Sequence, residues 1–174
     1  AIGTANNIDF FSDIVGLLFA QANVNVPADL DTKPAQDALT FYTNFVAEDK
    51  VWSPNLPEAS VAFSQEKASM IMVPIWNLLD IISQRPEMNI GVAPVPQATP
   101  EEPVSWATFW VDVVPLSSNN QREAWAYVKF LAEEEQQRDA YLENSNYRVF
   151  GNPYSRASIA SELDSNPYIS PLLS

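Results

Sequence analysis

The chain has 174 residues, of which 47% are hydrophobic, so it can form one domain or one lobe of a larger protein around a real core. Nine Lys and Arg residues are outnumbered by 22 Asp and Glu residues, and the formal charge of −13 argues against binding to nucleic acid or to anionic lipid. The absence of Cys and His from the sequence excludes thiol nucleophiles, histidine bases and the usual zinc ligands.

In the first 105 residues, helical patterns are separated by short apolar runs and proline-rich turns. Apolar residues at spacings of three and four predict four helices, over residues 8–21, 34–46, 58–65 and 75–83. The first helix is apolar on most sides and should be largely buried, with Asn6 or Asn7 as its N-cap. The apolar runs at residues 68–73 and 89–93 are expected to be strands.

In the remainder of the chain, residues 106–116 are rich in aromatic and β-branched side chains and predict a third strand. Asn120 and Glu123 form a capping pair for a helix whose apolar side carries Trp125. Two further helices are expected over residues 133–142 and 156–163. Helices alternate with a few short strands, so the predicted fold class is α/β with helix dominant. No apolar run approaches the ~18–20 residues of a membrane span, and no signal peptide is recognisable at the start.

Two stretches of the chain carry a resemblance to a known family. The first, from Val61 to Gln97, contains VAFSQEKASMIMVPIW followed by NIGVAPVPQ; the second is WATFWVDVVPLSSNNQREAWAYVKFL. Their order and spacing resemble the second lobe of the bacterial extracellular solute-binding proteins that serve ABC importers, in particular the sugar-binding group that includes maltose-binding protein. The chain departs from that pattern at Glu66 and at Val73 or Pro74, where the family usually has Gly and therefore a more permissive backbone.

The resemblance implies a helix-rich second lobe of a type II periplasmic-binding-protein-like fold with few short strands. It implies that residues 1–105 are a second-lobe segment, that residues 106–138 form a strand and helix that pack on the first lobe, and that residues 139–174 return to the second lobe. On this interpretation the chain lacks nearly the whole first lobe. Trp125 and Tyr127 are then expected to be partly exposed, which favours self-association.

Tryptophans are the candidate ligand-binding residues, because aromatic faces stack on the C–H faces of sugar rings while polar groups bind the hydroxyls. The resemblance implies that Trp76 lines the cleft, the alternative being core packing, and Asn77 beside it is either a ligand or a helix cap. Trp106 and Trp110 share one face of the expected strand. They flank the crossing to the other lobe and are further candidates, as is Trp52 in a proline-rich loop.

These features predict part of the substrate-binding component of an ABC importer, which binds a carbohydrate in an interlobe cleft and delivers it to the permease. We expect neither enzymatic activity nor a cofactor or metal, and an extracytoplasmic location, either periplasmic or lipid-anchored at the cell surface. Two alternatives stay open. One is a fragment of a glycan-acting enzyme or of its accessory domain, since 22 acidic residues leave many carboxylate pairs. The other is a self-assembling structural module.

Overall fold

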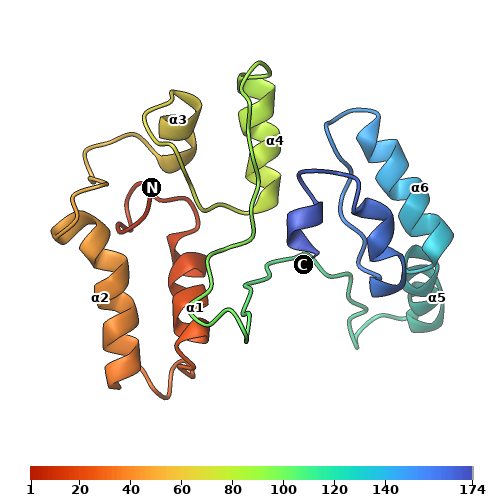
Figure 1. The fold of residues 1–174 in the computed structure, drawn as a ribbon. Coiled ribbons are helices and arrows are strands. Elements are labelled where there is room, and N and C mark those ends of the chain that lie inside the picture. The colour runs from red at the N-terminus through yellow and green to blue at the C-terminus, as the bar shows by residue number, and fades with distance from the viewer. Residues whose placement is uncertain (174) are drawn as a thin grey trace. The chain divides into compact units, whose positions relative to one another are not determined.

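A computed structural model describes residues 1–173 of the chain (Figure 1). Within these residues it contains six α-helices and two 3-10 helices. The α-helices are α1 (Phe11–Gln21), α2 (Lys33–Ala47), α3 (Ala59–Ser64), α4 (Ile75–Gln84), α5 (Gln121–Leu131) and α6 (Glu134–Ser145); the 3-10 helices are η1 (Ala157–Leu163) and η2 (Ser170–Leu172). The predicted dominance of helix is therefore confirmed.

The chain divides into two compact units. Unit 1 consists of Ala1–Met88 and Val95–Thr108, and unit 2 consists of Asn89–Pro94 and Phe109–Ser174. Helices α1 to α4 belong to unit 1, whereas α5, α6 and both 3-10 helices belong to unit 2. The assignment of residues 1–105, 106–138 and 139–174 to two lobes of a larger fold rests on the family resemblance and stays a prediction.

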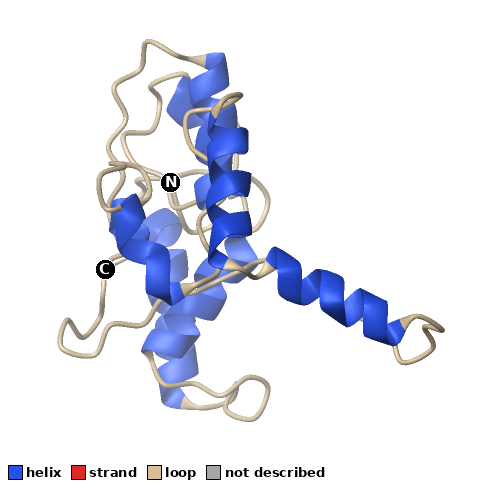
Figure 2. Cartoon of the chain, turned by 90° about the vertical axis from the view of Figure 1, so that its right-hand side faces the viewer, coloured by secondary structure: helices blue, strands red, loops and turns tan. Residues whose placement is uncertain are grey.

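The three predicted strands are not formed: residues 68–73, 89–93 and 106–116 are drawn as loop, and no strand occurs within residues 1–173 (Figure 2). A strand requires a second extended segment whose backbone groups pair with its own. The N–H group of Ala68 instead donates to the carbonyl of Ala62 in α3, and the N-terminal amine donates to the carbonyl of Met70. The composition of these runs suits strands, but no neighbouring strand pairs with them.

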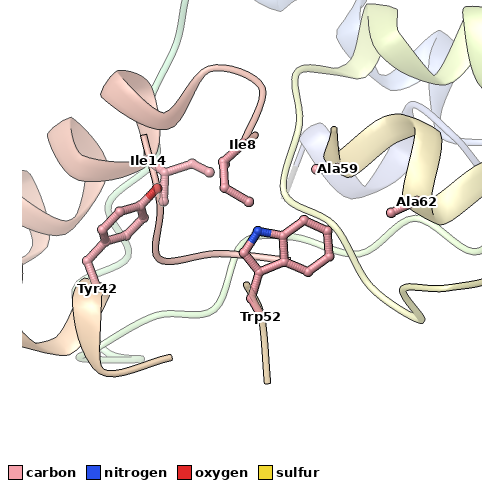
Figure 3. Close-up of a cluster of buried hydrophobic side chains, with 6 residues drawn as sticks. All are labelled: Ile8, Ile14, Tyr42, Trp52, Ala59 and Ala62. Atoms are coloured by element: carbon pink, nitrogen blue, oxygen red, sulfur yellow. The ribbon is translucent and has the colours of Figure 1, made fainter. Parts of the chain in front are cut away.

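The core of unit 1 lies where α1, α2 and α3 meet the loop that precedes α3 (Figure 3). Its buried side chains are Ile8, Ile14, Tyr42, Trp52, Ala59 and Ala62. A second cluster, of Phe19, Val24 and Ala35, extends the packing of α1 on α2. Each large apolar side chain that is fully buried contributes about 1.5–3 kcal/mol, so these clusters are the main source of stability in unit 1.

The side chain of Asn7 joins the segment before α1 to the loop that holds Trp52. Its Nδ2 donates to the carbonyl oxygens of Ser53 and Leu56, at 3.0 and 2.9 Å. Its Oδ1 accepts from the Trp52 indole nitrogen at 3.0 Å and from the Thr4 hydroxyl. Asn7 is 7% exposed, so this amide is shielded from water and uses both its donors and its acceptor.

The predicted helix caps were wrong in two places. Helix α1 begins later than expected, and its N-cap position is taken by Phe10, with no side-chain hydrogen bond, instead of by Asn6 or Asn7. The side chain of Asn7 does not cap α1, because its amide forms hydrogen bonds with the loop at Ser53 instead. Asn120 does occupy the N-cap position of α5, but its side chain forms no cap hydrogen bond, so the capping pair with Glu123 is not made.

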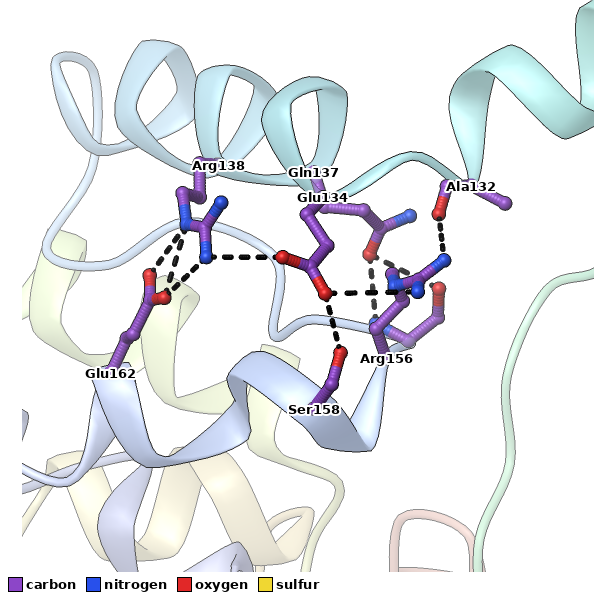
Figure 4. A network of polar contacts seen from close by, with 8 residues as sticks. Ala132, Glu134, Gln137, Arg138, Arg156, Ser158 and Glu162 are labelled. Atoms are coloured by element: carbon purple, nitrogen blue, oxygen red, sulfur yellow. Dashed lines mark hydrogen bonds and ion pairs between the residues drawn. The ribbon is translucent and has the colours of Figure 1, made fainter.

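In unit 2, ion pairs and hydrogen bonds join α6 to η1 and to Arg156 just before it (Figure 4). Arg138 of α6 binds Glu162 of η1 through two nitrogens, with Nε–Oε2 and Nη2–Oε1 distances of 2.9 and 2.6 Å. Glu134 lies 3.7 Å from Arg156 and accepts a hydrogen bond from Ser158 at 2.9 Å. The buried residues beneath these contacts are Phe150, Ile159, Leu163 and Ile169. The last predicted helix therefore forms, as a 3-10 helix.

Helix α5 and the segment before it are largely exposed. No residue of α5 is buried, and its aromatic side chains Trp125, Tyr127 and Phe130 are 49%, 61% and 44% exposed. Residues 109–114 donate no hydrogen bond to another backbone group within residues 1–173, and Trp110 among them is completely exposed. The partial exposure that was predicted for Trp125 and Tyr127 is thus observed. We call residues 109–116 together with α5 the exposed apolar surface.

Candidate functional site

An acidic pocket of about 300 Å³ lies in unit 1, between α3, α4 and the segment before α1. Its lining residues are Asp9, Glu58, Ser60, Val61, Ser64, Asn77, Asp80, Ile81 and Gln84. None of them is positively charged, so the pocket offers a ligand mainly hydrogen-bond acceptors. Its volume is at the lower end of the range for small-molecule sites. Within residues 1–173, no group of three acidic side chains is arranged to hold a metal ion.

A second cavity, of about 540 Å³, lies between α5 and α6 in unit 2. Its lining residues are Leu131, Gln136, Asp139, Ala140, Leu142, Glu143 and Asn146. It is larger, but Asn77 Oδ1, the buried side-chain atom that has no hydrogen-bond partner within residues 1–173, belongs to the lining of the acidic pocket and not to this cavity. We therefore place the candidate site at the acidic pocket of unit 1.

The side chain of Asp9 joins two walls of the acidic pocket. Its Oδ2 accepts from the backbone N–H of Ser60 at 3.2 Å and also from the Ser60 hydroxyl, which ties the segment before α1 to the first turn of α3. A hydrogen bond to the Asp9 carboxylate and the negative charge of that group raise the pKa of Glu58. Glu58 therefore keeps its proton to a higher pH than an ordinary glutamate. In that state it is a donor at the rim of the pocket.

An aromatic pair adjoins the pocket in the sequence. Trp76, in the first turn of α4, is 41% exposed, and its ring centroid lies 5.7 Å from that of Phe10 with an interplanar angle of 84°. This is an edge-to-face contact, a favoured arrangement of aromatic rings. Each ring is the direct chain neighbour of a pocket residue, since Asp9 precedes Phe10 and Asn77 follows Trp76. The two rings themselves are not among the lining residues of the pocket.

Asn77 contributes an unused acceptor to the pocket. Its backbone N–H donates to the carbonyl of Pro74 at 3.0 Å, as expected in a first helical turn. Its side-chain Oδ1 is buried and has no hydrogen-bond partner within residues 1–173. Leaving such a group unpaired costs about 1–3 kcal/mol, which a ligand hydroxyl or amine would recover. The alternative prediction, that Asn77 caps α4, does not hold, because Pro74 occupies the cap position.

The other three predicted tryptophans do not meet at this pocket. Trp52 is buried in the core of unit 1, where its indole nitrogen donates to Asn7. Trp106 packs on α1 so closely that a Cβ added at Gly16 would lie 2.7 Å from its ring. Trp110 belongs to unit 2 and extends into solvent. The structure thus places Asn77 in the candidate site, with Trp76 next to it in the chain, and leaves the other three elsewhere.

Residues 5–157 match the family model of bacterial extracellular solute-binding proteins, which covers well over half of the chain. The chain belongs to this family. No curated protein and no solved structure matches it. The matched residues of this solute-binding protein include the whole acidic pocket and both rings of the aromatic pair.

Membership of the family supports several of the predictions at a coarse level. It implies a periplasmic-binding fold, the binding of a small solute, an ABC permease as partner and an extracytoplasmic location. Solute-binding proteins are normally not enzymes. No helix within the described residues is long and apolar enough to cross a membrane.

Sequence reasoning missed Phe10 and Asp9 in this solute-binding protein. Both fall inside the stretch that was predicted to be the first helix, where Phe10 looks like an ordinary apolar residue of a buried face. Its left-handed backbone has no signal in the sequence, because that conformation is usually marked by Gly or Asn. Asp9 could have been found as a polar residue in a strongly apolar run, but one acidic residue there is a weak signal.

Proposed function

We propose that this protein binds a carbohydrate and delivers it to an ABC permease, and that Trp76 is the side chain on which the sugar stacks. The observation that carries the proposal is the half-exposed Trp76 indole, whose chain neighbour Asn77 lines a pocket of acceptor groups. An indole face covers the C–H face of a pyranose ring, while the hydroxyls around that ring need acceptors for their protons. Asn77 Oδ1 is one such acceptor and has no partner yet.

The charge of the pocket supports a neutral sugar over an anionic one. Asp9, Glu58 and Asp80 all line it, and no Lys or Arg does. The hydrogen bond with Asp9 and, after it, the like charge of that carboxylate raise the pKa of Glu58. A solute carboxylate or phosphate would add further negative charge here, whereas sugar hydroxyls would donate hydrogen bonds to these groups.

We propose further that unit 1 forms one side of an interlobe cleft in a type II periplasmic-binding-protein-like fold. In that arrangement residues 106–138 pack on the first lobe, which then covers the exposed apolar surface and closes over the solute by a hinge motion. The exposure of Trp110 and the lack of any buried residue in α5 support a missing partner. Contiguous apolar surface of this kind is unusual on a protein that has no partner.

A second candidate function, self-association, is favoured by the same exposed apolar surface. Two copies that bury Trp110 and α5 against each other would also shield these side chains from water. Light scattering after size-exclusion chromatography, over a hundredfold range of protein concentration, tests this. A mass that rises with concentration, and falls back in Trp110→Ser but not in Met70→Ser, supports self-association through this surface. Met70 is a matched control because it is an exposed apolar residue of unit 1. A constant monomer mass would remove this candidate.

The carbohydrate proposal is tested by titration of the protein expressed from its complete reading frame. Mono- and oligosaccharides are added while binding is followed by calorimetry and tryptophan emission. Saturable binding that is lost in Trp76→Leu and kept in Phe11→Leu supports stacking on Trp76, because Phe11 is an aromatic residue of unit 1 with a similar exposure. A neutral hexose should bind at least tenfold more tightly than the corresponding uronic acid. A folded protein that binds none of these sugars would refute the carbohydrate proposal.

A further inference from the structure

Phe10 has a backbone conformation that a bulky residue rarely adopts. Its φ and ψ angles are 55° and 34°, in the left-handed region. Gly and Asn are the usual residues there, because a larger side chain crowds the neighbouring carbonyl group. A strained residue of this kind persists where its surroundings fix it, and such residues are common at binding sites. The backbone alone therefore gives no reason for an aromatic ring at this position.

Hydrogen bonds on both sides hold the Phe10 backbone in place. On the N-terminal side, the carboxylate of Asp9 is bound by the N–H of Ser60 at 3.2 Å. On the C-terminal side, the carbonyl of Phe10 accepts from the N–H groups of Asp13 and Ile14, at 2.9 and 3.2 Å, and so begins α1. These hydrogen bonds fix the backbone at Phe10 and, with it, the direction of the bond from Cα to Cβ from which the ring extends.

The ring that this backbone directs is not used to fill the core. Phe10 is 40% exposed, and its ring contact is the edge-to-face pair with Trp76. Phe11 is a natural comparison, since it is 38% exposed and forms no aromatic pair within residues 1–173. Two adjacent residues of the same type and similar exposure thus differ in their backbone conformation and in the contact with Trp76.

We propose that Phe10 is a positioning residue that holds the indole of Trp76 in a single orientation, so that the indole is ordered before the solute arrives. This inference rests on the proposed function, in which Trp76 stacks on a sugar. An indole that is already ordered loses less conformational freedom on binding, and affinity rises accordingly. The strained backbone at Phe10 is the means by which the chain directs a ring at Trp76 from the start of α1.

The orientation of Trp76 can be measured without any ligand. The protein is labelled with 5-fluorotryptophan, which gives one fluorine resonance for each of the five tryptophans, and Trp76→Phe identifies the resonance of interest. Phe10→Leu keeps an apolar side chain but removes the ring, so the Trp76 resonance should shift and broaden. Phe11→Leu makes the same change one residue away and should leave it in place. Phe10→Tyr retains the ring and should restore the wild-type resonance.

Sugar titrations of the same variants complete the test. Phe10→Leu should weaken binding about three- to tenfold, the range expected for one aromatic pair, while Phe11→Leu and Phe10→Tyr stay near wild type. The midpoint of urea unfolding, measured for each variant, separates positioning from a loss of fold. An unchanged Trp76 resonance in Phe10→Leu, or equal effects of Phe10→Leu and Phe11→Leu, would overturn the proposal. If the wild-type protein binds no sugar, the proposed function fails, and the fluorine spectra still decide whether Phe10 orders Trp76.

Discussion

Replacement of Asn7 by Ala would test whether one buried amide fastens the segment before α1 to the rest of unit 1. The change removes the partner of the Trp52 indole N–H and of the carbonyl groups of Ser53 and Leu56. It also frees the hydroxyl of Thr4. Because Asn7 is almost completely buried, water does not readily replace the lost amide. The methyl group of alanine has no donor or acceptor with which to replace its hydrogen bonds.

The magnitude follows from the number of bonds. Each of the four hydrogen bonds contributes about 0.5–1.5 kcal/mol net, and a buried group left unpaired adds to the loss. We expect Asn7→Ala to lower the free energy of unfolding by about 3–4 kcal/mol. That is a large part of the ~5–15 kcal/mol by which a typical domain is stable. Trp52→Phe removes one of the four bonds, which costs about 1 kcal/mol, and also leaves space in the core, so its total cost should exceed that value.

Urea unfolding, followed by circular dichroism at 222 nm and by tryptophan emission, would give these free energies. Asn55→Ala is the matched control, because Asn55 is an exposed residue of the same loop whose side chain makes no hydrogen bond in the described structure. It should change stability by less than about 0.5 kcal/mol. If Asn7→Ala costs no more than Asn55→Ala, the amide does not fasten this segment. If the loss of stability in the double variant Asn7→Ala/Trp52→Phe equals the sum of the losses in the two single variants, the two side chains are not coupled.

Three further predictions concern charge and packing. In the folded protein, the hydrogen bond to Asp9 raises the pKa of Glu58, so stability falls as the pH rises from about 4.3 through the raised value. Glu58→Gln should therefore raise the melting temperature at pH 7 and not at pH 3. The ion pair with Arg138 lowers the pKa of Glu162, so its contribution is present above about pH 4.3 and is lost as the pH falls through the lowered value. Glu162→Gln should then lower the melting temperature at pH 7, and the difference from wild type should shrink towards pH 2. For either glutamate, a shift in melting temperature that is the same at neutral and at acid pH would contradict the stated pKa direction. In Gly16→Ala the new methyl group would clash with the ring of Trp106, so the usual gain of about 1 kcal/mol in helix stability should be absent. The gain should appear when Trp106 is also replaced by Ala. An equal gain with and without Trp106 would show that no clash exists.

Much of the helical structure could be predicted because it depends on local periodicity. The helix predicted over residues 75–83 is α4 (Ile75–Gln84), and the one predicted over residues 58–65 is α3 (Ala59–Ser64). The strands could not be predicted in the same way. Residues 106–116 have the composition of a strand, but a strand also needs a neighbour, and the sequence of one segment does not say whether a neighbour is present.

The candidate site was predictable only in part, and for a similar reason. Trp76 and Asn77 were identified through the family resemblance, which ties them to one short motif. The contact of Trp76 with Phe10, just before α1, joins residues more than sixty positions apart in the chain, and no periodic pattern records such a contact. Trp52 was a candidate because it lies in a proline-rich loop; in the structure it is buried in the core of unit 1, where its indole nitrogen donates to Asn7.

The packing of the helices also bears on the order in which the protein folds. The helices that pack most closely are neighbours in the chain, namely α1 with α2, α3 with α4, and α5 with α6. Contacts between neighbours form quickly, because little chain entropy is lost when they meet. Each pair can therefore form on the ribosome soon after its second helix emerges. The hydrogen bonds of the Asn7 amide, in contrast, join residues more than forty positions apart. When the protein refolds, the indole N–H of Trp52, which donates to Asn7, should therefore gain protection from pulsed hydrogen exchange later than the backbone N–H groups within the helices.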